Sequence, residues 1–428
     1  MHSRTSSSED EAPPEIDLRL ALICPPFPSH VQVFEVLASA LVGRGHEAIL
    51  ILQEGAQAFL SGDASYELIP PPAGSSTEQV IRQAAGASGL LGVLRTVANS
   101  AAATDNLCSH LPKVLNRLAV DAIIADQMEP AGGLVARHLG LPYLSLACAL
   151  PLERDERIPP PYLDWPYADD DAGIKRNRGG EMVSRLLLSA QRRTIKRWAE
   201  RFGLSNLETL EDCLSPAGTI AQLPKTLDYP RTGWGRPLLH VGPLREQRAR
   251  EELPIEIDPG RPFVFMSLGT LQGHRYSIFR AVAKACQSLD AQLLVAHCGG
   301  LNSTQAASVG ATWITDFVPQ REALARADIC VTHCGQNTVL DALEAGKPLL
   351  AIPIAFDQPG MAARIVHHGL GVKLTARSLT SRKAQHALET LLQNPSYTQR
   401  AHAVGAQMGS ESGVTKAIAH VEGLLQTN

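Results

Sequence analysis

One pair of polar residues follows apolar runs in the first third of the chain. His30 lies in PPFPSHV, directly after the run LRLALIC, and Asp126 ends the run VDAIIAD. A histidine accepts a proton near neutral pH, and a carboxylate can orient its ring and stabilise the imidazolium. Both residues are expected at the carboxyl edge of one parallel sheet, where open α/β sheets bind ligands. This pattern predicts a general base with a supporting acid. The alternative is a packing or capping His30 and an Asp126 that caps the following helix.

A second polar group lies in THCGQNTVLDALEAGKPLLAIPIAFDQPG, residues 332–360. The run DICVT predicts a strand and TVLDALEAG a helix, so the turn between them feeds a helix N-terminus that favours an anion. Gly335 would let backbone approach that anion, and His333, Asn337 and Thr338 could donate hydrogen bonds to phosphate oxygens. A glycine-containing turn of this kind is also common scaffolding.

Three further residues extend this pattern from phosphate to sugar. Asp341 lies on the first helical turn, where it could accept from ribose hydroxyls. Asp357 and Gln358 follow the next strand, and a carboxylate beside an amide could hold vicinal sugar hydroxyls. Singly, Asp341 could be a stabilising N-terminal charge, and the pair could be a turn. Their order along the chain favours a nucleotide-sugar as the ligand.

The segment 317–358 resembles the donor-binding signature of the UDP-glycosyltransferases, inverting enzymes of the GT-B fold. The stretch HCGQNTVLDALEAGKPLLAIPIAFDQPGMAARIVHHGLG looks most like the bacterial zeaxanthin glucosyltransferases of carotenoid synthesis. The resemblance covers nearly the whole chain from Leu18 onward. It implies two Rossmann-like doubly wound domains with a cleft between them, and a C-terminal helix that crosses back to the first domain. His30 and Asp126 match the His–Asp dyad of this family.

The resemblance also implies roles for the donor-binding residues. Uracil would stack on an aromatic and meet the neighbouring residues at its edge, the diphosphate would lie on two loops, and acidic residues with an amide would hold ribose and glucose. The residues at the uracil would be Phe317, Val318 and Gln320. Those at the diphosphate would be Gly269 and Thr270 of SLGT with His333, Gly335, Asn337 and Thr338. Ribose would be held by Asp341, and glucose by Asp357 and Gln358. Asp341 stands where the family usually has Glu, and Gln336 where plant members have Trp.

The elements that must position these residues follow a repeated βαβ pattern. An apolar run, a helical run with Val33, Leu37 and Leu41, and the run EAILIL form one unit, and a parallel sheet follows from it. The pattern restarts at FVFMSLG after a charged, proline-bounded stretch. We therefore expect an α/β protein with a disordered tail at 1–16, an acceptor-binding domain at 17–244, a linker at 245–260, a UDP-sugar-binding domain at 261–405 and a crossover helix at 406–428.

Composition narrows the class of protein. The net charge of −4 and the 5% aromatic content give no reason to expect nucleic-acid binding. The eight cysteines lack zinc-binding spacing, and the acidic stretch ADDD (168–171) lies in a proline-rich loop that we expect to be solvated, so neither a metal nor a cofactor is expected. No signal or membrane-spanning run is recognisable, which favours a cytoplasmic protein.

The segment 175–202 carries nine basic residues and an apolar stripe. Such a helix could contact an anionic membrane at the inner face, where a carotenoid would reside. An ordinary surface helix that packs its stripe on the first domain is the simpler interpretation.

The resemblance therefore implies transfer of glucose from UDP-glucose to the ring hydroxyl of zeaxanthin. One alternative is another hydrophobic hydroxylated acceptor, such as a polyketide, sterol or flavonoid-like molecule. An alternative of another class is a catalytically silent UDP-sugar-binding partner protein.

Overall fold

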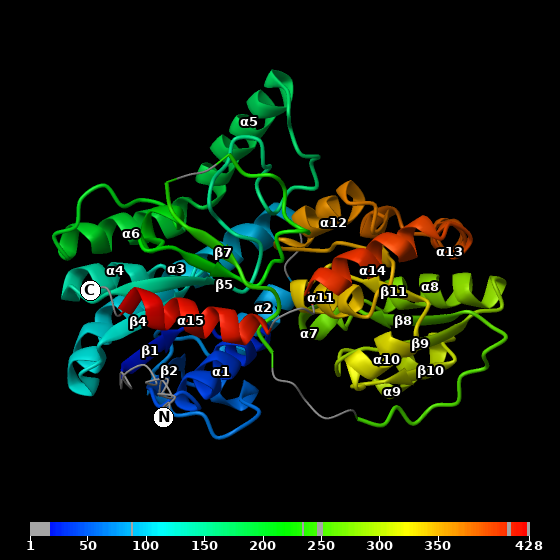
Figure 1. Ribbon diagram of the computed structural model, residues 1–428, viewed down its shortest axis with the longest axis horizontal. Coiled ribbons are helices and arrows are strands. Elements are labelled where there is room, and N and C mark those ends of the chain that lie inside the picture. Colours follow the sequence, from blue (N-terminus) through cyan, green and yellow to red (C-terminus); the bar gives the residue numbers. More distant parts are fainter. Residues whose placement is uncertain (1–17, 87–88, 233–234, 246–250, 409–411, 426–428) are drawn as a thin grey trace, which may run out of the picture.

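The computed structural model describes residues 18–86, 89–232, 235–245, 251–408 and 412–425 of the 428-residue chain. The predicted tail at 1–16 lies outside the described residues, as do 246–250 of the predicted linker. Figure 1 shows two lobes, each built on a sheet with helices on its faces. No helix among the described residues is long and apolar enough to cross a membrane.

Within the described residues, the first sheet has seven parallel strands in the order β3-β2-β1-β4-β5-β6-β7. The strands are β1 (Arg19–Ile23), β2 (Glu47–Gln53), β3 (Tyr66–Ile69), β4 (Ala122–Asp126), β5 (Tyr143–Ala147), β6 (Thr219–Ala221) and β7 (Leu238–His240). The helices are α1 (Pro28–Val42), α2 (Thr77–Ala85), α3 (Gly89–Leu118), α4 (Ala131–Leu139), α5 (Asp171–Leu187) and α6 (Ser189–Arg201).

The second sheet has six parallel strands in this part of the chain, in the order β10-β9-β8-β11-β12-β13. They are β8 (Phe263–Ser267), β9 (Gln292–Ala296), β10 (Trp313–Thr315), β11 (Ile329–Thr332), β12 (Leu349–Ala351) and β13 (Gly371–Lys373). The helices are α7 (Gly269–Gln272), α8 (Tyr276–Ser288), α9 (Ser303–Ser308), α10 (Gln320–Arg326), α11 (Gln336–Glu344), α12 (Gln358–His367), α13 (Ser381–Gln393) and α14 (Ser396–Met408).

The strand order decides where ligands can bind. In each sheet the chain reverses its direction of travel between two central neighbours, β1 and β4 in the first sheet and β8 and β11 in the second. Loops on either side of such a reversal diverge and leave a crevice at the carboxyl ends of the strands. His30 and Asp126 flank the first reversal, and the loops at 268–270 and 333–338 flank the second.

The C-terminal helix crosses back to the first lobe, as the fold prediction required. α15 (Gly413–Leu425) packs Ala417, Ile418 and Val421 into the core formed with α1 and β1, and Figure 1 shows it over that lobe. The preceding helix, α14, still packs on α11 in the second lobe. α14 ends at Met408 and α15 begins at Gly413, and residues 409–411 lie outside the described residues.

The basic segment at 175–202 differs from the single helix that its sequence predicted. α5 ends at Leu187 and α6 starts at Ser189, so the apolar stripe is divided between two helices. Ile195 and Trp198 of α6 are buried against α3, whereas Val183 of α5 is exposed. The stretch ADDD is also not simply a solvated loop, because the Asp170 carboxylate accepts a hydrogen bond from Gly173 N–H and caps α5.

Candidate active site

The two predicted catalytic residues lie side by side. Asp126 ends β4, and His30 lies in the first turn of α1, which follows the neighbouring strand β1. Pro28 starts that helix, because a proline at the first helical position loses no hydrogen bond. The His30 Nδ1 and Asp126 Oδ2 atoms are 2.7 Å apart. Since the carboxylate accepts from Nδ1, the other ring nitrogen, Nε2, is left to accept a proton.

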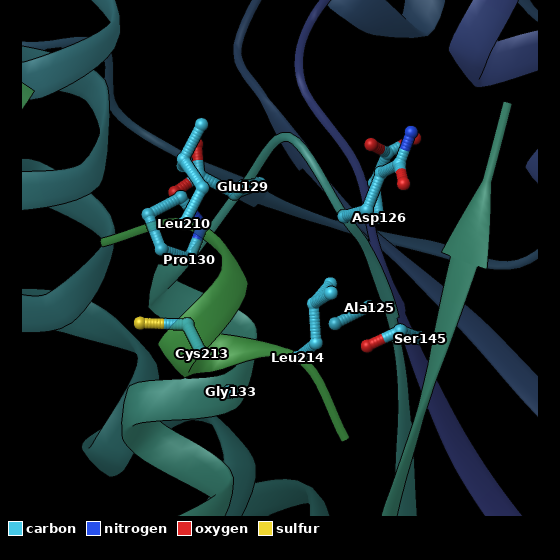
Figure 2. Close-up of a pocket in the computed structure, with 10 residues that line it drawn as sticks. Ala125, Asp126, Glu129, Pro130, Gly133, Ser145, Leu210, Cys213 and Leu214 are labelled. Carbon is cyan, nitrogen blue, oxygen red and sulfur yellow. The ribbon is translucent and has the colours of Figure 1, made fainter. Parts of the chain in front are cut away.

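The surroundings of His30 adjust its basicity. Burial lowers the pKa of the imidazole, but the negative charge of Asp126, its hydrogen bond and the charge of Asp357 together raise it above the usual histidine value. Asp126 is buried, and its second oxygen accepts from Met128 N–H at 2.8 Å. Figure 2 shows Asp126, at the end of β4, apart from Glu129 on the loop that follows the strand. The predicted base, His30, is thus held in one orientation by Asp126, and Asp126 is itself held by the Met128 N–H.

Cys148 completes the surroundings of the dyad. One ligand atom from each of His30, Asp126 and Cys148 lies within 4.8 Å of the others, a grouping that could hold a metal ion. Burial, followed by the charge and hydrogen bond of Asp126, raises the pKa of the Cys148 thiol well above its usual range. The protonated thiol is a hydrogen-bond donor to Asp126.

The two predicted phosphate loops meet around one imidazole. Thr332 pairs with Ser267 at the ends of β11 and β8, so the loops that follow are neighbours. A Cβ atom added to Gly269 would lie 2.7 Å from the His333 ring, and one added to Gly335 would lie 2.5 Å from it. Glycine at both positions therefore makes room for His333 between the loops.

His333 and its neighbour Gln336 present buried polar atoms that the protein itself does not satisfy. Among the described residues, His333 Nδ1 and both amide atoms of Gln336 have no hydrogen-bond partner. Burial lowers the pKa of His333 to about 4, although the Ser267 backbone acts in the opposite direction, so the ring is neutral at pH 7. Buried polar groups without partners are rare in proteins, and here they lie at the N-terminus of α11, where an anionic ligand is favoured.

The other predicted phosphate contacts surround the same helix end. Asn337 is partly buried and Thr338 is buried in the first turn of α11, while Thr270 is exposed at the start of α7. The α11 N–H groups of this turn have no residue before them in the helix to bond to. These side chains and amides are therefore suitable hydrogen-bond donors for a diphosphate.

The predicted ribose acid has partners that its sequence did not reveal. Asp341 pairs with Arg245, which also contacts Glu344 at 2.6 Å, and Gln320 Nε2 donates to Asp341 Oδ2 at 2.6 Å. Burial lowers the pKa of Arg245 to about 10. Asp341 is thus already held in the absence of ligand.

The base-binding residues lie beside this cluster. Phe317 is 68% exposed and presents a free aromatic face, whereas Val318 is partly buried against the second core. Gln320 starts α10. An exposed aromatic ring near the predicted ribose-binding acid, Asp341, is a suitable surface for a nucleobase.

The predicted sugar-binding pair lies after β12 and faces the first lobe. Asp357 Oδ2 accepts from Leu150 N–H at 3.1 Å, a contact that joins the lobes. Burial raises the pKa of Asp357, and the Leu150 hydrogen bond and His30 lower it. Gln358 uses its carbonyl oxygen to accept from Ile354 and Ala355 N–H, so its amide NH₂ remains for a ligand.

Sequence reasoning missed Arg245 and Cys148 among the residues of this site. Arg245 was assigned to the linker, and its approach to Asp341 depends on the path of a segment 96 residues away. Cys148 follows β5, the strand next to β4. Its place at the carboxyl edge of the sheet was the one available signal, because edge positions of neighbouring strands share a site.

Comparison with known proteins agrees with this geometry. The family model described as UDP-glucoronosyl and UDP-glucosyl transferase matches residues 236–405. The zeaxanthin glucosyltransferase of Pantoea ananas is 39% identical over 416 residues, 95% of this chain and 96% of that protein. That of Pseudescherichia vulneris is 39% identical over 406 residues, 94% of this chain and 97% of that protein. The solved glycotransferase of kitacinnamycin has the same fold, with a TM-score of 0.77 and 17% identity over 96% of this chain and 100% of that one.

Proposed function

Because the chain belongs to the UDP-glucoronosyl and UDP-glucosyl transferase family and is a glycosyltransferase, we propose that it transfers glucose from UDP-glucose to the ring hydroxyl of zeaxanthin. The two bacterial relatives that bear this name align over nearly their whole lengths, which supports this acceptor. Asp357 and Gln358 support glucose as the sugar, because this pairing accompanies glucose in the family that the sequence resembles.

In the proposed reaction, the acceptor hydroxyl oxygen attacks the anomeric carbon of glucose. Its proton passes to Nε2 of His30 as the new carbon–oxygen bond forms, while Asp126 stabilises the imidazolium. The bond between the anomeric carbon and the β-phosphate oxygen breaks, and UDP leaves with the electron pair. Attack from the opposite face inverts the configuration at that carbon. The N-terminus of α11, with His333 and Thr270, would stabilise the charge on UDP.

One observation carries this proposal: the predicted dyad and the predicted sugar-binding residue Asp357 lie near each other at the junction of the two lobes. The hydrogen bond from Leu150 to Asp357 joins the carboxyl edge of the first sheet to that of the second. His30 and Asp357 each influence the pKa of the other, so the base lies near the residue proposed to hold the transferred sugar.

The proposal is tested with the purified protein, labelled UDP-glucose and zeaxanthin in detergent micelles. We expect zeaxanthin monoglucoside first and diglucoside later. His30→Ala should lower the transfer rate by about 10²–10⁴-fold, the usual contribution of general-base catalysis. His386→Ala, on the exposed surface of α13, is the matched control and should retain full activity.

The possible results separate the alternatives. Transfer to a polyketide, sterol or flavonoid in preference to zeaxanthin would retain the reaction and replace the acceptor. Binding of UDP-glucose without transfer to any hydroxylated acceptor would indicate the catalytically silent partner protein. A His30→Ala variant with most of its activity would refute the role of the dyad.

The exposed face of α5 supports the further proposal that the protein contacts an anionic membrane while it binds its acceptor. Met182, Val183 and Leu186 are 70%, 56% and 74% exposed, and Lys175 and Arg185 are exposed on the same helix. The opposite face is buried: a Cβ atom added to Gly180 would lie 2.8 Å from Trp165. Figure 1 shows α5 projecting from the body above the junction of the lobes.

The charges on this helix favour a lipid surface over a second copy of the chain. In a two-fold interface, Lys175 and Arg185 would face the same basic residues of the second copy and repel them. Anionic headgroups attract both residues. Arg192 and Arg197 of α6 are paired with Glu208 and Asp105, so the proposed contact is confined to α5.

Sedimentation with anionic vesicles at low salt tests this contact. Met182→Ser/Leu186→Ser should abolish sedimentation, and Val42→Ser, another exposed apolar residue, should leave it unchanged. Absence of sedimentation by the wild type would contradict the proposal, as would dimerisation in solution that the double variant abolishes.

A further inference from the structure

Gln127 follows β4 directly, and its side-chain amide holds the segment around Pro151. It is 2% exposed, and its backbone N–H donates to Leu146 O at 3.0 Å. Its amide Nε2 donates to Leu150 O at 2.9 Å, and its Oε1 accepts from Leu152 N–H at 3.0 Å. A side chain that donates and accepts in this way fixes the backbone of the segment on both sides of Pro151.

The segment held by Gln127 in turn holds the donor side of the site. Leu150 N–H donates to Asp357 Oδ2, while the Leu150 side chain is buried in the core of the second lobe. The same loop makes a second contact with that lobe, because Gly360 N–H donates to Pro161 O at 2.9 Å. Asp357 is therefore oriented by an amide that belongs to the other lobe.

These contacts form an unbroken chain from the base to the sugar-binding carboxylate. His30 is hydrogen-bonded to Asp126, and Gln127 is the next residue in the chain. The Gln127 amide donates a hydrogen bond to Leu150 O, and Leu150 N–H donates one to Asp357. Hydrogen bonds to a carboxylate are stronger and more directional than those between neutral groups. Loss of the hydrogen bonds from Gln127 to the Leu150 segment should therefore change the orientation of Asp357 more than the stability of either core.

We propose that Gln127 is a positioning residue that sets the Asp357 carboxylate, through Leu150, for the glucosyl group of the donor. This inference rests on the proposed function, since it requires that Asp357 binds the donor sugar. Gln127 touches neither substrate in this account. Asp357 Oδ2 accepts from Leu150 N–H, and a carboxylate has further lone pairs that can accept from a sugar hydroxyl.

The test measures the contribution of the glucosyl group to donor binding, which needs no acceptor. The quantity is the ratio of the Kd for UDP to the Kd for UDP-glucose, determined by calorimetry for each variant. Gln127→Leu should lower this ratio about tenfold, the scale of one charge-assisted hydrogen bond, and leave the Kd for UDP unchanged. Asp357→Asn should lower the ratio at least as much.

The double variant distinguishes positioning from general damage. If Gln127 acts through Asp357, then Gln127→Leu should lower the ratio less than twofold in an Asp357→Asn background, because residues that act as one unit do not add. A tenfold loss in that background as well would overturn the inference.

Gln292→Leu is the matched control. Gln292 is also a buried glutamine that donates to a backbone carbonyl and accepts from a backbone N–H, both of Asp258 at 2.9 Å, but it lies at the opposite edge of the second sheet. The Gln292→Leu variant should lose about as much thermal stability as Gln127→Leu, while its ratio of the Kd for UDP to the Kd for UDP-glucose should not change. Gln127→Glu, which retains the acceptor for Leu152, provides the measurement if Gln127→Leu does not fold.

The remaining outcomes are separable. A wild-type protein that does not bind UDP would refute the proposed donor and the inference together. Wild-type binding of UDP-glucose with an unchanged ratio in Gln127→Leu would overturn the inference and leave the proposed function in place.

Discussion

At the scale of single residues, the raised pKa of His30 has a direct consequence for the rate. The base must be neutral to accept the acceptor proton, so kcat/KM should fall as the pH drops through a pKa above the usual histidine value of about 6.5. Asp126→Asn removes the charge that raises this pKa. The acidic limb of the profile should then move to lower pH while kcat falls. A limb that stays in place would contradict the pairing of His30 with Asp126.

The close contact of Gly269 and Gly335 with the His333 ring leads to a second prediction at this scale. Gly335 has φ −62° and ψ 136°, a conformation open to any residue, so Gly335→Ala acts only through the steric contact with His333. The displaced ring should raise the Kd for UDP about tenfold with little change in Tm. Gly179→Ala, which meets nothing within 4 Å, is the control and should bind UDP normally. Unchanged UDP affinity in Gly335→Ala would exclude His333 from the diphosphate site.

At the scale of elements, the loop between β4 and α4 contains a buried acid. Burial raises the pKa of Glu129 to about 7, although hydrogen bonds from Thr104 and Ala131 oppose the shift. The folded state therefore prefers the protonated form. Protonated Glu129 stabilises the folded state fully below its pKa in the unfolded chain, near 4.5. This stabilisation is lost as the pH rises through the folded-state pKa of about 7. Glu129→Gln should thus gain about 2–3 kcal/mol relative to the wild type between pH 4.5 and 8. Urea denaturation at both pH values measures the difference in free energy of unfolding between Glu129→Gln and the wild type. A difference that does not increase with pH would refute the raised pKa of Glu129.

The sequence predicts the long, regular elements of the fold and misses the short or interrupted ones. Apolar runs that end at β1, β4, β8 and β11 placed the site residues at strand ends, since a buried parallel strand reads as a continuous apolar run. The strands β6 and β13 have three residues each, too few for a periodic signal. The break between α5 and α6 at Leu188 has no glycine or proline to mark it. Contacts such as Arg245–Asp341 depend on how distant segments pack, which periodicity does not report.

At the scale of the whole molecule, a buried ion pair joins the lobes. Arg364 of α12 and Asp228 of the first lobe are 2% and 4% exposed, and Arg364 Nη2 lies 2.9 Å from Asp228 Oδ1. Arg364 also lies over the Tyr229 ring, 4.4 Å from its centre. Burial raises the pKa of Asp228, but Arg364 and Arg231 outweigh it and hold that pKa below its usual range. The pair exists only while the lobes are docked, so it stabilises the arrangement that brings His30 to the donor.

The two halves of this pair should not be equivalent. Asp228 has a second partner, Arg231 at 2.6 Å, so Arg364→Met leaves the carboxylate paired. Asp228→Asn leaves two arginines without their anion, and an uncompensated buried charge costs about 3–5 kcal/mol. Urea denaturation should therefore show a larger loss for Asp228→Asn than for Arg364→Met, with the transition of the lobes separating into two steps in the former. The opposite order, or a single transition in both variants, would mean that the lobes are held together mainly by α15 and the Leu150 loop.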